Sequence, residues 1–306
     1  MSSHRVLITG ASGYLGGTLL ARLKDADLPR YEKLYALVRS DTQAEAVGQY
    51  GAEAVRLDLQ DEDAVRKAIV DNKITIIYFL IDAMRADSQV YLIKGLAEVK
   101  EATGQEVHFL HPVMANCTVV EEAERRGVRS YIFIPCVVYG KGEGFGNVIS
   151  IQTVAIIKAA QAMKRVYKVD EGRPTWPVCH IIDNTNLYIQ ILRMILKGDD
   201  PGHGKNGYFL ASSGSIAWYD LYAAVAAAMA ERNVVTDDSV IPASKQILEQ
   251  MGEALGCPPG VVTVQIGGQC TLTAKHGKKI GWKPRFAPEH IIEDADAEVQ
   301  LILDNL

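Results

Sequence analysis

The stretch Arg5–Gly16, RVLITGASGYLG, decides the fold. Its first five residues, Arg5–Thr9, form a short apolar run that ends at a glycine, which is typical of a buried parallel strand. Three glycines follow with the spacing GxxGxxG, and apolar residues then recur with helical spacing over residues 18–24. The stretch therefore predicts a strand, a glycine-rich turn and a helix in direct succession.

Each of the three glycines has a physical role in a loop that holds a dinucleotide. Gly10 allows a tight turn, Gly13 lets the backbone approach a pyrophosphate, and Gly16 lets the helix pack close to the strand. The phosphates would meet free N–H groups at the start of the helix. Because the glycines lie between a strand and a helix, a dinucleotide loop is favoured over a plain tight turn.

Strands and helices alternate along the first half of the chain. Strands are predicted over residues 34–39, 54–59, 74–81, 107–110 and 131–135, and helices over residues 61–70, 88–102 and 118–126. The strands are nearly continuous apolar runs. We therefore expect an α/β fold, a doubly wound parallel sheet of the Rossmann type with helices on both faces.

The alternation changes after residue 139. The sequence then predicts a strand over residues 178–182 and helices over residues 149–164, 187–197, 218–232 and 245–255. We expect a dinucleotide-binding Rossmann domain over residues 1–140, to which residues 178–200 return. Residues 141–177 and 201–306 would form a smaller, C-terminal substrate-binding lobe.

The composition excludes several classes of protein. With 306 residues, 48% hydrophobic, 23% charged and a net charge of −5, the chain is an ordinary globular protein without the basic face of a nucleic-acid binder. We see neither an apolar run that could span a membrane nor a signal peptide, so a cytoplasmic location is expected. The five cysteines form no CxxC pair, so we expect no metal site and no disulfide framework.

The residues after the second and third strands bear on the choice of cofactor. An acidic residue after the second strand would bind a ribose 2′-hydroxyl and indicate NAD, but this chain has Val38-Arg39-Ser40. A guanidinium can bind a 2′-phosphate with two charge-assisted hydrogen bonds, so Arg39 favours NADP over the alternative of a solvated surface arginine. Asp58 lies either near the adenine or at the cap of the helix that follows.

The motifs together resemble the short-chain dehydrogenase/reductase superfamily, in its extended, epimerase/dehydratase-like branch. TGASGYLG, LVRS and LDLQD are similar to its dinucleotide-binding segments, and Pro135–Gly140, PCVVYG, resembles its "RPxxVYG" stretch. His180–Asn184, HIIDN, and Gly281–Pro284, GWKP, are similar to two later segments of that branch. The matches occur in the same order from about residue 5 to residue 285, so the resemblance covers most of the chain.

The resemblance implies a set of cofactor-binding residues and an NADP site. These residues are Gly10, Ser12, Gly13, Tyr14, Leu15, Arg39, Asp58, Leu59, Leu80, Ile81, Pro135 and Val138. The last two would lie near the nicotinamide. Relatives in the superfamily often dimerise, so the resemblance also allows a homodimer.

The catalytic pair of that superfamily is missing. Its chemistry uses a tyrosine and a lysine at the spacing YxxxK, one helical turn apart, but none of the 13 tyrosines here has a lysine four residues later. Two explanations are open. Either the chain lacks the catalytic loop, or the residues of a long disordered loop near His111–Asn116 are missing from the sequence as it stands. We favour the second explanation because long disordered loops concentrate at active sites. The catalytic residues are left unassigned.

Single residues elsewhere have structural interpretations that we favour over catalytic ones. His111 ends the fifth strand and faces the expected cofactor cleft, Cys136 is expected to be packed, and Asp183 is expected to cap a helix that starts near Asn186. The leading functional hypothesis is an NADP-dependent oxidoreductase or epimerase-like enzyme that acts on a small organic molecule. The alternatives are a non-redox enzyme (an isomerase, lyase or hydrolase) and an NADP-sensing regulatory protein.

Overall fold

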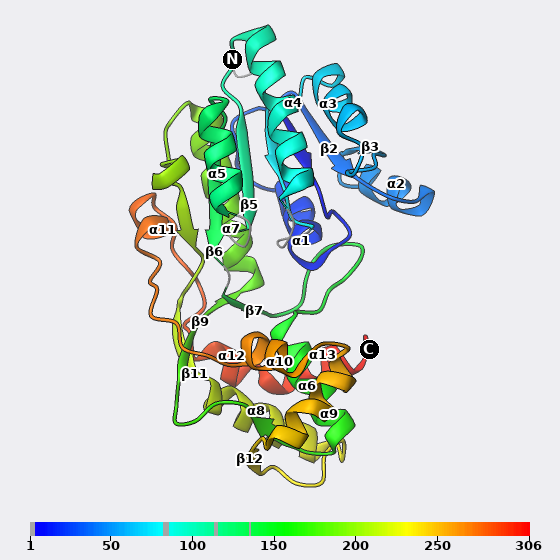
Figure 1. Ribbon diagram of the computed structural model, residues 1–306, viewed down its shortest axis with the longest axis vertical. Helices are drawn as coiled ribbons and strands as arrows, with labels where there is room; N and C mark the ends of the chain where they lie inside the picture. The colour runs from blue at the N-terminus through cyan, green and yellow to red at the C-terminus, as the bar shows by residue number, and fades with distance from the viewer. Residues whose placement is uncertain (1–3, 82–85, 113–115, 135) are drawn as a thin grey trace.

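The computed structural model describes residues 4–81, 86–112, 116–134 and 136–306. Seven parallel strands form its central sheet, in the order β10-β6-β5-β4-β1-β2-β3 (Figure 1). Their bounds are β1 Arg5–Ile8, β2 Lys33–Leu37, β3 Glu53–Val55, β4 Ile76–Tyr78, β5 His108–Pro112, β6 Arg129–Ile134 and β10 Tyr208–Leu210. The order places β4 at the centre, and the order in which the chain adds strands reverses between β1 and β4, which confirms the doubly wound fold.

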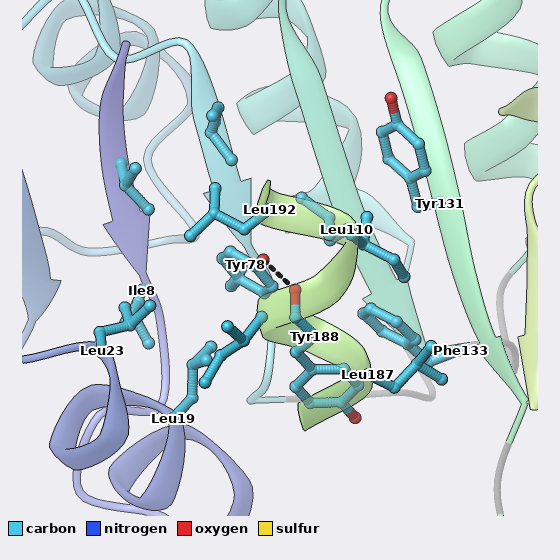
Figure 2. Close-up of a cluster of buried hydrophobic side chains, with 14 of the residues drawn as sticks. Ile8, Leu19, Leu23, Tyr78, Leu110, Tyr131, Phe133, Leu187, Tyr188 and Leu192 are labelled. Carbon is cyan, nitrogen blue, oxygen red and sulfur yellow. Dashed lines mark hydrogen bonds between the residues drawn. The ribbon is translucent and has the colours of Figure 1, made fainter. Parts of the chain in front are cut away.

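Helices cover both faces of this sheet, as the apolar strands require. On one face lie α1 (Tyr14–Leu23), α2 (Asp41–Gly48) and α7 (Ile181–Lys197), and on the other α3 (Glu62–Asp71), α4 (Asp87–Thr103) and α5 (Asn116–Arg125). Figure 2 shows the core beneath α1 and α7, where Leu19 and Leu187 pack on strand residues such as Ile8 and the Tyr78 hydroxyl donates to Tyr188 O. This buried layer fixes the position of α1 on β1.

A second lobe lies beyond the carboxyl ends of the strands, in the lower half of Figure 1. Strands β7 (Val137–Tyr139), β9 (Thr175–His180) and β11 (Gly214–Ala217) form one sheet, and β8 (Val166–Lys168) pairs with β12 (Val240–Pro242). One apolar core joins its helices α6 (Gln152–Met163), α8 (Trp218–Glu231), α9 (Lys245–Leu255), α10 (Pro259–Ile266), α12 (His290–Glu293) and α13 (Ala295–Leu303). A short helix, α11 (Lys275–Lys279), packs beside β10 instead.

Glu298 on α13 anchors this lobe to the chain that leaves β7. Its side chain is 3% exposed, and its two carboxylate oxygens accept hydrogen bonds from Gly140 N–H and the Ser150 hydroxyl, both at 3.0 Å. Burial raises the pKa of Glu298, although both hydrogen bonds favour the ionised form.

Two predicted boundaries differ from the structure for physical reasons. Helix α7 begins at Ile181 with His180 as its cap, so the prediction that Asp183 caps a helix near Asn186 is wrong. Asp183 is buried in the first turn and accepts from Arg285 N–H and Phe286 N–H at 2.8 and 3.0 Å. Strand β10 pairs with β6 in the central sheet, whereas the predicted domain boundaries assign its residues to the second lobe.

No helix in the four described ranges has the length and apolar character needed to cross a bilayer.

Three buried histidines and one half-buried histidine make the fold less stable at mildly acidic pH. Burial lowers the pKa of His4, His111 and His180 to about 4, and that of His108 well below 6.5. Each ring binds a proton more readily in the unfolded chain, so its contribution is present above pH 6.5 and is lost as the pH falls towards 4. We expect the free energy of unfolding to fall by about 1 to 2 kcal/mol for each such ring between pH 7 and pH 5.

Urea unfolding at the two pH values measures this change. Most carboxyl groups titrate below pH 5, and the raised pKa of Glu298 acts in the opposite direction, so a loss of stability in this window reports the histidines. An equal or higher free energy of unfolding at pH 5 would contradict the expectation.

Candidate functional site

The turn between β1 and α1 leaves no space for side chains at two of its glycines. Gly10 has φ +69°, and a Cβ atom there would lie 2.6 Å from Leu80 O. A Cβ atom on Gly16 would lie 2.3 Å from Gly10 O, because α1 passes directly against the turn. Both positions therefore require glycine, as the sequence pattern predicts.

The N-terminus of α1 faces this turn without a side-chain cap. Gly13 is the N-cap, its own N–H donates to Gly10 O at 2.8 Å, and no side chain accepts from the first turn of the helix. The N–H groups of that turn, which starts at Tyr14 and Leu15, are thus the orphan donors that attract a phosphate. The Tyr14 side chain is buried and its hydroxyl donates to Gly140 O at 2.6 Å, so only its backbone belongs to this donor set.

Arg39 lies at the carboxyl end of β2 with its guanidinium unpaired among the described residues. The side chain is exposed, while its backbone N–H donates to Gln43 Oε1 at 2.8 Å. Ser40 caps α2 by accepting from Gln43 N–H, and the Gln43 amide also donates to the Ser12 hydroxyl at 3.2 Å. An unpaired cation, the N-terminus of α2 and the glycine turn therefore meet at one place.

Asp58 and Leu59 follow β3 on the same edge of the sheet. Asp58 is exposed and accepts from Gln60 N–H at 2.9 Å, whereas Asp61 caps α3 by accepting from Ala64 N–H. The alternative that Asp58 caps this helix is therefore wrong. The chain after β4 lies over the glycine turn, where Leu80 O contacts Gly10 and the Ile81 side chain is 51% exposed.

The remaining predicted contacts lie near β7. Val138 pairs with Cys179 across β7 and β9, and it packs against the same core as Leu80 and Ile134. Pro135 lies outside the described residues. Burial raises the pKa of the Cys136 thiol to about 12, and its Sγ donates to Ala211 O at 2.9 Å, so Cys136 is packed, as expected, and is no thiolate nucleophile.

The connection between β5 and α5 is short. Strand β5 ends at Pro112 and α5 begins at Asn116, so three residues, 113–115, join them and lie outside the described residues. The favoured explanation of a long loop that has been left out is therefore wrong for this chain. His111 at the end of β5 is fully buried, and its Nε2 has no hydrogen-bond partner among the described residues.

A second group of titratable side chains lies between the two lobes. A cavity of about 810 Å³ is lined by His180, His290, Asp294 and Glu298, with Gly142 and Gly144 on its other wall. The Tyr139 hydroxyl and His290 Nδ1 are 3.2 Å apart at its edge. Cβ atoms on Gly142 and Gly144 would meet Tyr14 and Gly17, so the loop after β7 separates this cavity from α1.

Gln43 and Thr9 have roles that the sequence did not reveal. Thr9 Oγ1 accepts from Leu80 N–H at 3.0 Å and fixes the chain after β4 over the turn. Ser40 and Gln43 have the spacing of a capping box, which is a sequence signal that could have identified Gln43. No group of three or more His, Cys, Asp or Glu side chains that could hold a metal ion occurs in the part of the chain that the structure describes.

Comparisons with known proteins agree with this architecture. Residues 6–102, from β1 to α4, match the model of the NAD dependent epimerase/dehydratase family, which confirms the resemblance over that part of the chain. The curated sterol demethylase protein B of Methylococcus capsulatus is 26% identical over 126 residues. That match covers 41% of this chain and 32% of the relative, so it spans about a third of the relative's length.

Solved structures extend the similarity to nearly the whole chain. A UDP-glucose 4-epimerase of Thermotoga maritima, solved with UDP-glucose, superposes with a TM-score of 0.63 at 13% identity. The match covers 98% of this chain and 99% of the epimerase chain. A UDP-glucuronic acid 4-epimerase of Bacillus cereus, solved with a UDP-sugar and NAD, gives a TM-score of 0.62 at 11% identity and covers 99% and 100%. At these identities the likeness establishes the fold of both lobes.

Substitution of Gly16 by alanine tests the geometry of the turn. The added methyl group would lie 2.3 Å from Gly10 O, so the helix and the turn must move apart. We expect Gly16→Ala to weaken dinucleotide binding by about tenfold or more, measured by NADPH fluorescence titration, and to lower the melting temperature.

Gly48→Ala is the matched control. A Cβ atom at Gly48 on α2 meets nothing within 4 Å, so affinity and melting temperature should stay at or above those of the parent chain. Equal NADPH affinities of the Gly16→Ala and Gly48→Ala proteins would show that the turn does not hold the dinucleotide.

Proposed function

We propose that this chain binds NADP and acts as an oxidoreductase or epimerase-like enzyme of the extended short-chain dehydrogenase/reductase type, on a small organic molecule. The cofactor-binding residues that we propose are Gly10, Ser12, Gly13, Tyr14, Leu15, Arg39, Asp58, Leu59, Leu80, Ile81, Pro135 and Val138. The family-model match over residues 6–102 and the similarity to solved epimerases support a nicotinamide cofactor.

The unpaired guanidinium of Arg39 is the observation that supports NADP over NAD. It lies after β2, where the ribose 2′ position is recognised in this fold, and no carboxylate of the described residues pairs with it. The nearest ion pair along this edge joins Arg56 to Asp41 and leaves Arg39 free. A 2′-phosphate would supply the missing partner through charge-assisted hydrogen bonds.

Arg39→Ala tests this choice of cofactor. The variant loses the bonds to the 2′-phosphate but none to the rest of the dinucleotide. We therefore expect its NADPH affinity to fall by about tenfold or more while its NADH affinity changes little. Arg56→Ala, which removes a nearby guanidinium already paired with Asp41, is the control for general charge effects. Equal losses for NADPH and NADH would contradict a role of Arg39 at the 2′-phosphate.

The missing Tyr/Lys pair supports a second candidate, in which the bound cofactor undergoes no net oxidation or reduction. The short connection after β5 holds neither a tyrosine nor a lysine. A non-redox enzyme would use the cofactor structurally or would use no cofactor. An NADP sensor would bind the cofactor but convert no substrate. Tyr139, His290 and Asp294 at the cavity between the lobes offer acid–base groups without the pair.

Absorbance at the nicotinamide band separates these functions. An oxidoreductase consumes or produces NADPH when a substrate is added, and we expect such a change for at least one compound in a panel of small ketones, alcohols and nucleotide sugars. Turnover with an unchanged spectrum indicates either an epimerase-like cycle, in which the hydride returns to the product, or the non-redox enzyme. Tight NADPH binding with no turnover across the panel indicates the sensor, and absence of NADPH binding contradicts both the oxidoreductase and the sensor.

A further inference from the structure

The largest cavity described lies at the amino ends of the central strands, whereas the glycine turn lies at their carboxyl ends. It has a volume of about 880 Å³ and opens at the amino ends of β1, β5 and β6. Residues from three kinds of element surround it: strand starts, the C-terminal end of α4, and the end of α7. They include His4, His108, Lys73, Lys197 and Asp199.

Two buried imidazoles line this cavity. His4 is 7% exposed and His108 is 3% exposed, and their rings meet edge to face with centroids 5.5 Å apart. Burial lowers the pKa of both rings, so both are neutral at pH 7. A neutral ring carries one N–H, and the partners of Nδ1 determine which nitrogen holds it.

The hydrogen bonds of His4 place its proton on Nε2. His4 Nδ1 lies 2.9 Å from the Thr75 hydroxyl and 3.1 Å from the Gln105 side-chain nitrogen. An amide nitrogen can only donate, so Nδ1 accepts. His108 Nδ1 lies 2.9 Å from the Tyr131 hydroxyl. Neither His4 Nε2 nor His108 Nε2 has a hydrogen-bond partner within the described ranges. The His4 ring therefore brings an unused donor to the cavity.

The charged side chains of the wall divide into paired carboxylates and unpaired ammonium groups. Glu32 pairs with Arg5 at 2.5 Å, and Glu106 pairs with Arg129 at 3.0 Å and with Lys100 at 3.2 Å. Lys73 and Lys197 have no ion pair among the residues that the structure describes. Asp199 is the carboxylate of the cavity wall that has no ion pair among the described residues. The wall therefore carries two unpaired ammonium groups and one unpaired carboxylate.

Backbone caps satisfy part of the two helix ends beside the cavity. Helices α4 and α7 both end here, and free carbonyl groups at a helix C-terminus would repel an anion. Gly104 N–H donates to Lys100 O at the end of α4. Gly198 N–H and Asp199 N–H donate to Ile195 O and Met194 O at the end of α7. These caps occupy three of the carbonyl groups that would oppose a negative ligand.

We propose that this cavity is a binding site for a small oxyanion, a phosphate or carboxylate group that is bound by the Lys73 and Lys197 ammonium groups and by His4 Nε2–H. The group would supply several acceptor oxygens to donors that have no partner of their own. The two lysines come from different segments, the turn before β4 and the end of α7, and line the same cavity as His4. This site is separate from the dinucleotide turn and does not depend on the proposed function.

Histidine-detected NMR tests the proposal with inorganic phosphate as the probe. Ring signals of His4 and His108 are followed in long-range ¹H–¹⁵N spectra at constant ionic strength, and His4→Asn identifies the His4 signal. We expect the signals of both rings to shift and to saturate as phosphate is added. The midpoint should be the same in an Arg39→Ala background, in which phosphate binding at the dinucleotide turn is weakened. Acetate and succinate arms distinguish a carboxylate site from a phosphate site.

Charge-removing variants connect the shifts to the lysines. Lys73→Gln and Lys197→Gln should each weaken the anion about threefold or more, and together about tenfold or more. Lys245→Gln, on the exposed start of α9 in the other lobe, is the matched control and should leave the midpoint unchanged. Ring signals that do not move with any of the three anions, or equal weakening in all three single variants, would overturn the proposal.

Discussion

Close contact between the backbones of the first turn and the first helix is the constraint on which the rest of the structure depends. Gly16 approaches Gly10 O so closely that a single methyl group would separate them. This contact allows α1 to start at the edge of β1 and to direct the N–H groups of its first turn at the space above the sheet. The same approach brings Leu19 and Leu23 onto the strands (Figure 2), so the turn and the core stabilise each other.

The polar surroundings of the turn give it its electrostatic character. Arg39, the capped start of α2 and the uncapped start of α1 lie along one edge, and Gln43 joins Arg39 to Ser12 by hydrogen bonds. Positive charge and orphan N–H donors thus accumulate where the strands end, while the acidic Asp58 is turned towards its own backbone at Gln60. An edge with these properties favours anionic ligands on physical grounds alone.

The sequence predicts the parts of the molecule that local pattern determines. Periodicity identified most strands and helices, and the glycine spacing identified the turn, because both depend on residues adjacent in the chain. Long-range contacts were hidden: Asp183 accepts from Arg285 and Phe286, about a hundred residues away, which leaves His180 to cap α7. Strand β10 is equally unpredictable, since three apolar residues become a strand only beside β6. The missing Tyr/Lys pair was visible at once, but the absence of a long loop followed only from where β5 ends and α5 begins.

The loop that follows β7 is held to the dinucleotide turn by main-chain contact. Cβ atoms on Gly144 and Gly146 would lie 2.6 Å from Gly17 Cα and 2.2 Å from Ser12 O, and Asn147 N–H donates to Ser12 O. Gly146 is nevertheless exposed to solvent. Surface positions normally accept most replacements, but Gly146 is exposed and yet leaves no space for a side chain. Replacement of Gly146 is therefore expected to cost as much stability as replacement at an interior position, although the residue is exposed.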